Sequence, residues 1–154
     1  MMTFTSTSMP GYSKMKIKDE LKQKLAASLS QEKDILFAYL FGSATRGGFN
    51  QESDLDIALY FDDRMKPDEQ FQKRIRLMEY LQNKTGRKVE VLNLVEITSI
   101  FFKFVIIKEG KVILERDHSS RVDFELKTMN EYYDFQPFLR EYNRSYIKRS
   151  LARV

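Results

Sequence analysis

Residues 42–61, GSATRGGFNQESDLDIALYF, carry two short polar motifs at the junctions between apolar segments. A Gly-Ser pair directly follows Ile35–Phe41 (ILFAYLF), a continuous apolar run whose length is typical of a buried strand. After ten more residues, Asp54–Phe61 alternates with a period of two, so Asp54 and Asp56 share one face while the other face is apolar. The pattern predicts two strands, the second of which starts with two acids.

The two motifs together suit the binding of a phosphate and a divalent cation. Gly42 has no side chain, so a phosphate can approach the backbone there, and the Ser43 hydroxyl adds a donor. Asp54 and Asp56 project to the same side of a strand and can share divalent cations, which prefer oxygen ligands. A Gly-Ser turn or a pair of acids at a strand end is common by itself, whereas their combination favours a nucleotide held with Mg²⁺.

The surrounding segments predict an α/β or α+β core. Leu21, Leu25 and Leu29 recur at every fourth residue and predict a helix over residues 14–31. The rest of the core is expected to contain a helix from Pro67 to just before Gly86, a strand over Lys88–Leu94 and a strand over Lys111–Arg116. The apolar segment Glu96–Lys108 fits a short helix or a strand equally well.

The sequence has no strand signal from Ser119 onward. Apolar residues at helical spacing predict one helix over Val122–Tyr133 and a second over Leu139–Leu151, separated by Pro137, which interrupts regular helices. We therefore expect three parts in the chain: a partly ordered leader over residues 1–13, a core over residues 14–118 and a helical C-terminal tail over residues 119–154.

Length and composition exclude several classes of protein. The 154 residues fit one domain, and the absence of cysteine excludes disulfide scaffolds, thiol nucleophiles and cysteine zinc sites. The longest apolar stretch, Ile100–Ile107, is interrupted by Lys103 and is shorter than the roughly 20 residues that a membrane-spanning helix needs. The first twelve residues lack the basic start and apolar core of a secretory signal, so we expect a cytoplasmic protein.

The net charge of +4 is concentrated at one end of the chain. Phe138–Val154 contains five basic residues and one acid, so this segment carries the whole excess and the other residues sum to zero. A basic protein often binds nucleic acid, but only when the charge forms a patch on the relevant surface. We therefore expect no direct binding of nucleic acid by this protein.

Gly42-Ser43, ten residues and then Asp54-x-Asp56, with apolar strands on both sides, resemble the signature of the DNA polymerase β-like nucleotidyltransferases. The chain looks most like their minimal branch, the MntA antitoxins of HEPN/MNT toxin-antitoxin pairs. The stretches RKVEVLNLVEI, FKFVIIKEGKVILERD and EYYDFQPFLREY extend the likeness from about residue 17 to residue 147. The resemblance implies a nucleotidyltransferase-like fold, a small mixed β-sheet flanked by helices, with the helical tail added.

The resemblance also implies a metal site. Asp54 and Asp56 would hold two Mg²⁺ ions that bridge the triphosphate of ATP, as in two-metal enzymes generally. The position of the family's third carboxylate falls on Glu90, which would complete the metal site or activate the acceptor hydroxyl. Many relatives have Asp at Glu90 and a second acid at Asn93, so the longer Glu90 side chain has to be placed differently.

Nucleotide contacts are implied for three residues of the loop that follows the first strand. Gly42 and Ser43 would bind the phosphates, and Arg46, in the same loop, can neutralise the β- or γ-phosphate. In the family's reaction, an acceptor oxygen attacks the α-phosphorus of ATP and pyrophosphate leaves. Positioning and charge stabilisation supply most of the catalysis in such transfers.

The expected function is that of an antitoxin enzyme, a protein adenylyltransferase that transfers AMP from ATP to a tyrosine of a cognate HEPN-family ribonuclease toxin. A hetero-oligomer with the toxin is expected, docked through the C-terminal tail. Two alternatives stay open. The protein can be a non-catalytic antitoxin that acts by binding alone, or a nucleotidyltransferase whose acceptor is a small molecule or RNA, although the short chain leaves no room for an acceptor-binding domain.

Overall fold

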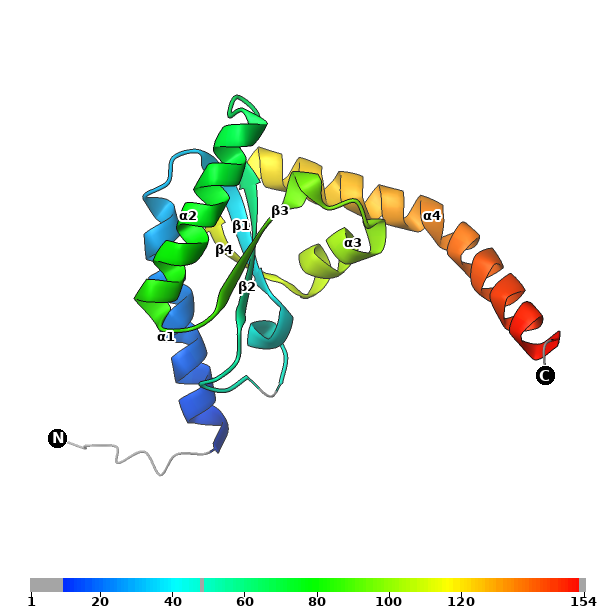
Figure 1. Ribbon diagram of the computed structural model, residues 1–154, viewed down its shortest axis with the longest axis horizontal. Coiled ribbons are helices and arrows are strands. Elements are labelled where there is room, and N and C mark those ends of the chain that lie inside the picture. The colour runs from blue at the N-terminus through cyan, green and yellow to red at the C-terminus, as the bar shows by residue number, and fades with distance from the viewer. Residues whose placement is uncertain (1–9, 48, 153–154) are drawn as a thin grey trace.

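The structure, a computed structural model, describes residues 10–47 and 49–152, which form four α-helices and a four-stranded sheet (Figure 1). In chain order the elements are α1 (Pro10–Ser30), β1 (Ile35–Phe41), the 3₁₀ turn η1 (Gly42–Thr45), β2 (Leu55–Phe61), α2 (Pro67–Thr85), β3 (Val89–Asn93), the 3₁₀ turn η2 (Leu94–Glu96), α3 (Ile100–Glu109), β4 (Lys111–Glu115) and α4 (His118–Ala152).

The sheet is mixed, and its strand order is β3-β2-β1-β4. The strand β1 lies between β2 and β4 and is antiparallel to both, whereas β2 and β3 are parallel and are connected through α2. This confirms the predicted α/β fold with a small mixed sheet flanked by helices. The register pairs Phe41 with Asp56, and Asp56 with Glu90, which places the end of β1 beside the starts of β2 and β3.

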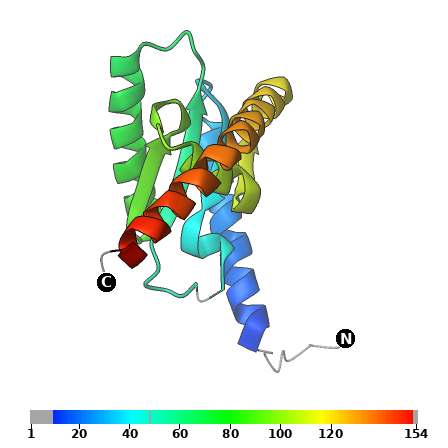
Figure 2. The same cartoon turned by 90° about the vertical axis from the view of Figure 1, so that its right-hand side faces the viewer.

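Each face of the sheet is covered by two helices (Figure 1, Figure 2). One buried cluster joins α1 and α2 to the sheet, and its helix side chains include Leu25, Leu29, Leu77 and Leu81. A second cluster joins α3 and α4 to the opposite face, where the strands present Phe37, Tyr39, Phe41 and Ala58 against residues such as Ile106 and Phe124. The apolar side of β2 packs in the first cluster, as the alternation of its residues predicts.

The ends of α2 follow from local chemistry. Pro67 stands in the first turn, where its missing N–H costs nothing, and acidic Asp68 and Glu69 follow at the positive end of the helix dipole. Gly86 ends the helix in the left-handed conformation with φ of 66°, and its N–H bonds to the carbonyl of Gln82. The chain can therefore turn directly from α2 into β3.

The segment for which helix and strand were both open is a helix. Ser99 caps α3, because its side chain accepts a hydrogen bond from the N–H of Phe102. Phe104 and Ile106 are buried, whereas Phe101 is exposed. Periodicity could not reveal this helix because apolar residues occupy nearly all of its sides.

Two predicted boundaries were wrong. Pro137 lies inside a single helix, α4, and does not separate two helices. A proline removes one backbone hydrogen bond and disturbs the preceding turn, but a long helix can bend at such a point and continue. The helix α1 begins at Pro10 and not at residue 14, while residues 1–9 lie outside the described part of the chain. No helix within the described residues is both long and apolar enough to cross a membrane.

Truncating Leu81 tests how strongly α2 is held to the sheet. The side chain is fully buried, so Leu81→Ala should lower the free energy of unfolding by about 2–5 kcal/mol, measured by urea denaturation. Asn83, two residues further along the same helix, is exposed, and Asn83→Ala should lower it by no more than about 0.5 kcal/mol. Equal effects of the two changes would contradict the packing of α2 described above.

Candidate active site

Three acidic residues meet at one edge of the sheet. Asp54 directly precedes β2, Asp56 is the second residue of that strand, and Glu90 is the neighbour of Asp56 on the parallel strand β3. Adjacent strands lie about 4.8 Å apart, so the two strands bring their acids together. Asp54 and Glu90 are exposed and Asp56 is half-buried.

The acids influence one another electrostatically. Burial, followed by the negative charges of Glu90 and Asp54, raises the pKa of Asp56, and the positive charge of Lys88 acts in the opposite direction. A carboxylate whose ionised form is disfavoured by neighbouring acids is a candidate ligand for a cation. Within the described residues, however, no group of three or more His, Cys, Asp or Glu side chains is arranged to hold a metal ion. The three acids therefore form an acidic patch and not a preformed metal cage.

Gly42 explains the first half of the sequence motif. Its φ is +74°, a backbone conformation that residues with side chains rarely adopt. A Cβ atom built on Gly42 would lie 2.3 Å from Oδ2 of Asp56. Such a separation is far below van der Waals contact, so the backbone at the end of β1 lies directly against the carboxylate. The glycine is required both for its backbone conformation and for this close approach.

Ser43 and the residues after it form one turn of 3₁₀ helix. The Ser43 hydroxyl donates a hydrogen bond to the backbone carbonyl of Asp54 at 3.3 Å, and Thr45 donates to the carbonyl of Gly42 at 2.9 Å. The structure thus brings Gly42, Ser43 and the three acids together. Their predicted roles toward a nucleotide or a metal stay predictions.

Arg46 is directed toward α3. Its Nη2 lies 3.0 Å from Oε2 of Glu109, the last residue of that helix, and both side chains are largely exposed. Exposed ion pairs contribute only about 0–1 kcal/mol, so this pair does not prevent the guanidinium from moving to a phosphate.

Two basic residues at the start of β3 belong to the same region and were not predicted. Arg87 donates from Nη1 to the backbone carbonyls of Asn50 at 2.7 Å and Ser53 at 3.0 Å, which fixes the loop that leads into Asp54. The positive charge of Lys88 acts to lower the pKa of Asp56. The alternation of Lys88 with Glu90 is the sequence signal that would have placed the lysine on the face of the acids.

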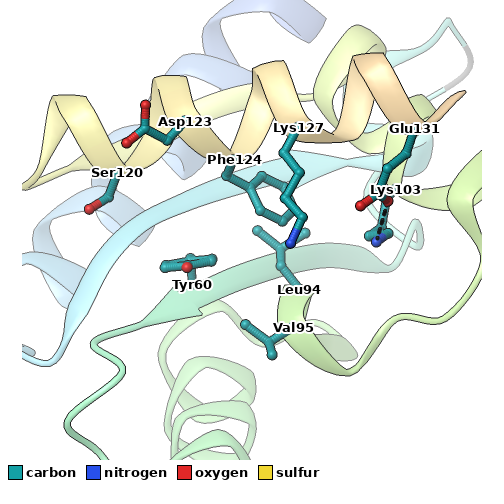
Figure 3. A pocket seen from close by; sticks show the side chains of 9 residues that line it. All are labelled: Tyr60, Leu94, Val95, Lys103, Ser120, Asp123, Phe124, Lys127 and Glu131. Atoms are coloured by element: carbon teal, nitrogen blue, oxygen red, sulfur yellow. Dashed lines mark hydrogen bonds and ion pairs between the residues drawn. The ribbon is translucent and has the colours of Figure 1, made fainter. Parts of the chain in front are cut away.

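A pocket of about 350 Å³ lies elsewhere on the α3 and α4 side of the sheet (Figure 3). Tyr60, near the far end of β2, lines it together with Lys103 and Lys127 from the two helices. Asp56 and Tyr60 are four residues apart, about 13 Å along a strand, and the acids do not line this pocket. The acidic patch is therefore separate from this pocket, and two of its three acids, Asp54 and Glu90, are exposed.

Comparisons with known proteins place this sequence in a known family. The sequence model of the polymerase beta nucleotidyltransferase family matches residues 23–119. A relative from Methanocaldococcus jannaschii, named as a protein adenylyltransferase, is 36% identical over 81 residues, which are 51% of this chain and 79% of the relative.

Two solved structures share the fold at low sequence identity. A chain of a toxin-antitoxin crystallised with AMP-PNP superimposes with a TM-score of 0.66 and 21% identity over 82% of this chain and 98% of that chain. A second chain comes from the complex of a tri-AMPylated Shewanella oneidensis HEPN toxin with an MNT antitoxin. It superimposes with a TM-score of 0.63 and 19% identity over 84% of this chain and 98% of that chain. They confirm the predicted nucleotidyltransferase-like architecture.

The close approach at Gly42 can be tested by adding a methyl group. Gly42→Ala should lower the free energy of unfolding by at least about 1 kcal/mol, because the positive φ alone costs an alanine about that much and the carboxylate of Asp56 must also move. Gly47, in the same loop, has no atom within 4 Å of its built Cβ and no positive φ. Gly47→Ala is therefore the matched control, expected within about 0.5 kcal/mol of the wild type by urea denaturation. Equal stability of the two variants would contradict the described contact.

Proposed function

The chain belongs to the polymerase beta nucleotidyltransferase family, and we propose that it is an antitoxin enzyme that transfers AMP from ATP to a tyrosine of a HEPN-family ribonuclease toxin. The observation that carries the proposal is the contact of the Gly42 backbone with Asp56, beside Asp54 and Glu90. The name of the 36% identical relative supports adenylyl transfer. The complexes with an ATP analogue and with an AMPylated toxin support the nucleotide and the acceptor.

The acidic patch fits Mg²⁺ by the chemistry of its donors. Its ligands would be carboxylate oxygens, which hard divalent cations prefer. Burial and then repulsion from Glu90 and Asp54 raise the pKa of Asp56, and the positive charge of a bound cation would relieve the repulsion. Asp54 and Asp56 would hold two ions, with Glu90 as a further ligand after a change of side-chain position. The metal supplies stabilisation of the negative charge on the phosphates.

The protein's own residues bind and orient the reactants. Gly42 leaves the backbone open to the phosphates. The Ser43 hydroxyl exchanges the carbonyl of Asp54 for a phosphate oxygen, and Arg46 exchanges Glu109 for the β- or γ-phosphate. The tyrosine oxygen forms a bond to the α-phosphorus while the bond from that phosphorus to the bridging oxygen breaks and pyrophosphate leaves. Glu90, where it is not a metal ligand, accepts the proton of the attacking hydroxyl.

The C-terminal part of α4 is the proposed docking surface for the toxin. Phe124, Thr128 and Glu131 face the body of the protein, where Phe124 packs in the second core cluster, Thr128 is buried and Glu131 lies 3.5 Å from Lys103. The same spacing of three and four residues continues to Phe135, Phe138 and Tyr142, which are 41%, 69% and 64% exposed. We call residues 135–152 the arm, because α4 extends there beyond the rest of the molecule (Figure 1).

An apolar stripe that continues a packed helix face into solvent is typical of a protein interface. Arg149 lies on the same side as this stripe, seven residues after Tyr142, but two other basic residues of the arm do not. With 3.6 residues per turn, Arg140 and Arg144 lie on the opposite side of the helix from Phe138 and Tyr142. We therefore assign toxin docking to the aromatic side.

Neutralisation by binding alone is the alternative, and in it the three acids would have no catalytic role. One carboxylate placed against a glycine at φ of +74°, with two further acids beside it, favours the enzyme, because a protein that only binds has no need for this repulsive arrangement. An acceptor that is a small molecule or RNA is the other alternative.

Transfer is tested with radiolabelled ATP, Mg²⁺ and the product of the adjacent gene. The wild type should label a tyrosine of that product, identified by mass spectrometry. Asp54→Asn or Asp56→Asn should reduce the transfer rate at least about 100-fold, because each removes a negative charge that would hold the Mg²⁺ ions on the phosphates. Asp63→Asn, an exposed acid outside the site, is the matched control and should keep the full rate.

The controls separate loss of chemistry from loss of fold. Asp56→Asn should unfold at the same temperature as the wild type or higher, because the ionised form of Asp56 is disfavoured in the folded protein. If the Asn variants keep the full rate, the assignment of the acids is wrong. If they lose transfer and still neutralise the toxin in cells, neutralisation is by binding.

Docking is tested on the arm with the same purified partner. Phe138→Asp or Tyr142→Asp should weaken binding in calorimetry more than about tenfold, since exposed aromatic residues commonly dominate interfaces. Arg144→Ala, on the opposite side of the arm, should stay within about threefold. A larger loss for Arg144→Ala than for Phe138→Asp would transfer the docking surface to the basic side.

A further inference from the structure

Lys88 lies beside the acidic patch without pairing with it. The N–H of Leu55 donates to the carbonyl of Lys88 at 2.9 Å, and the register pairs Leu55 with Val89, so the lysine backbone lies opposite Asp54. Because side chains alternate along a strand and Val89 is buried, Lys88 and Glu90 project to the same, exposed side.

The ammonium group of Lys88 is available to a ligand. Within the described part of the chain, it forms no hydrogen bond or ion pair, although its charge acts on Asp56. The neighbouring guanidinium groups differ in this respect: Arg46 pairs with Glu109, and Arg87 donates to the carbonyls of Asn50 and Ser53.

An unpaired lysine next to three acids has two physical explanations. As a counter-charge only, it would offset the repulsion between the carboxylates, and it would compete with any cation that binds them. As a ligand-binding group, it would contact an anion that bridges over the acids, which a flexible ammonium does well. A counter-charge is most effective in direct contact, and Lys88 forms no ion pair with the acids, which favours the second explanation.

We propose that Lys88 binds the triphosphate of the nucleotide at the two phosphates that leave as pyrophosphate. The inference rests on the proposed function and adds a residue to the same site. When the bond between the α-phosphorus and the bridging oxygen breaks, the electron pair stays on the pyrophosphate oxygen, and the Lys88 ammonium offsets the added negative charge. No proton has to be transferred by the lysine for this role.

The proposal predicts a pattern of ligand binding that depends on the phosphates beyond the first. Hydrogen bonds to charged groups contribute about 1.5–3 kcal/mol, so Lys88→Gln should weaken the binding of pyrophosphate and of AMP-PNP by about 10- to 100-fold. Binding of AMP, which lacks these phosphates, should stay unchanged. Lys88→Arg keeps the positive charge and should recover most of the affinity.

The experiment is calorimetric titration of the full chain with pyrophosphate, AMP-PNP and AMP, each in the presence of Mg²⁺, with Mn²⁺ titrated separately. Lys84→Gln, in the last turn of α2, removes a second exposed lysine and should alter none of the affinities. Thermal unfolding of each variant checks that the fold is kept.

Three results would overturn the role of Lys88. Unchanged affinity of Lys88→Gln for pyrophosphate and AMP-PNP contradicts it, and so does an equal loss of AMP binding. Tighter Mn²⁺ binding with unchanged pyrophosphate affinity would identify a counter-charge only. A wild-type protein that binds neither AMP-PNP nor pyrophosphate would contradict the proposed function itself, which distinguishes that failure from a failure confined to Lys88.

Discussion

The contact between the Gly42 backbone and the Asp56 carboxylate is the constraint on which the candidate site depends. Phe41 and Asp56 are partners across β1 and β2, so the chain leaving β1 has to pass directly over the carboxylate. Hydrogen bonds fix the last residues of the loop between β1 and β2. Ser43 donates to the carbonyl of Asp54, and Arg87 donates to the carbonyls of Asn50 and Ser53. The register of the sheet thereby determines the geometry of the site.

The apolar centre of the sheet differs from its rim, the edge that carries the three acids. In the middle of the sheet, residues such as Ala58 are covered by α3 and α4, and the apolar contacts there stabilise the fold. At the edge, burial and then the charges of Glu90 and Asp54 raise the pKa of Asp56. Functional sites often retain such repulsion because a bound ligand relieves it, so the rim is the part of the fold that a cation and a nucleotide would stabilise.

Much of the core could be predicted because β1, β2 and β3 have apolar runs or period-two alternation, and α2 has a proline start and a glycine end. The identity of α3 could not, since a uniformly apolar segment shows no period. The predicted break at Pro137 was wrong because a long helix can bend at a proline and continue. In the site, spacing identified the acids and the Gly-Ser pair, but the pairing of Arg46 with Glu109 joins residues 63 positions apart and depends on tertiary packing.

Because α4 is continuous, it fixes the distance between the body of the protein and the proposed docking surface. Thr128 is buried against the body, and Tyr142 stands fourteen residues further along the helix, a rise of about 21 Å. A toxin held by the aromatic stripe would therefore sit at a defined span from the sheet, set by backbone hydrogen bonds and not by a flexible linker. In the proposed complex, the helix would fix the distance between the docking point and the acids, and this distance would favour one acceptor tyrosine over the others.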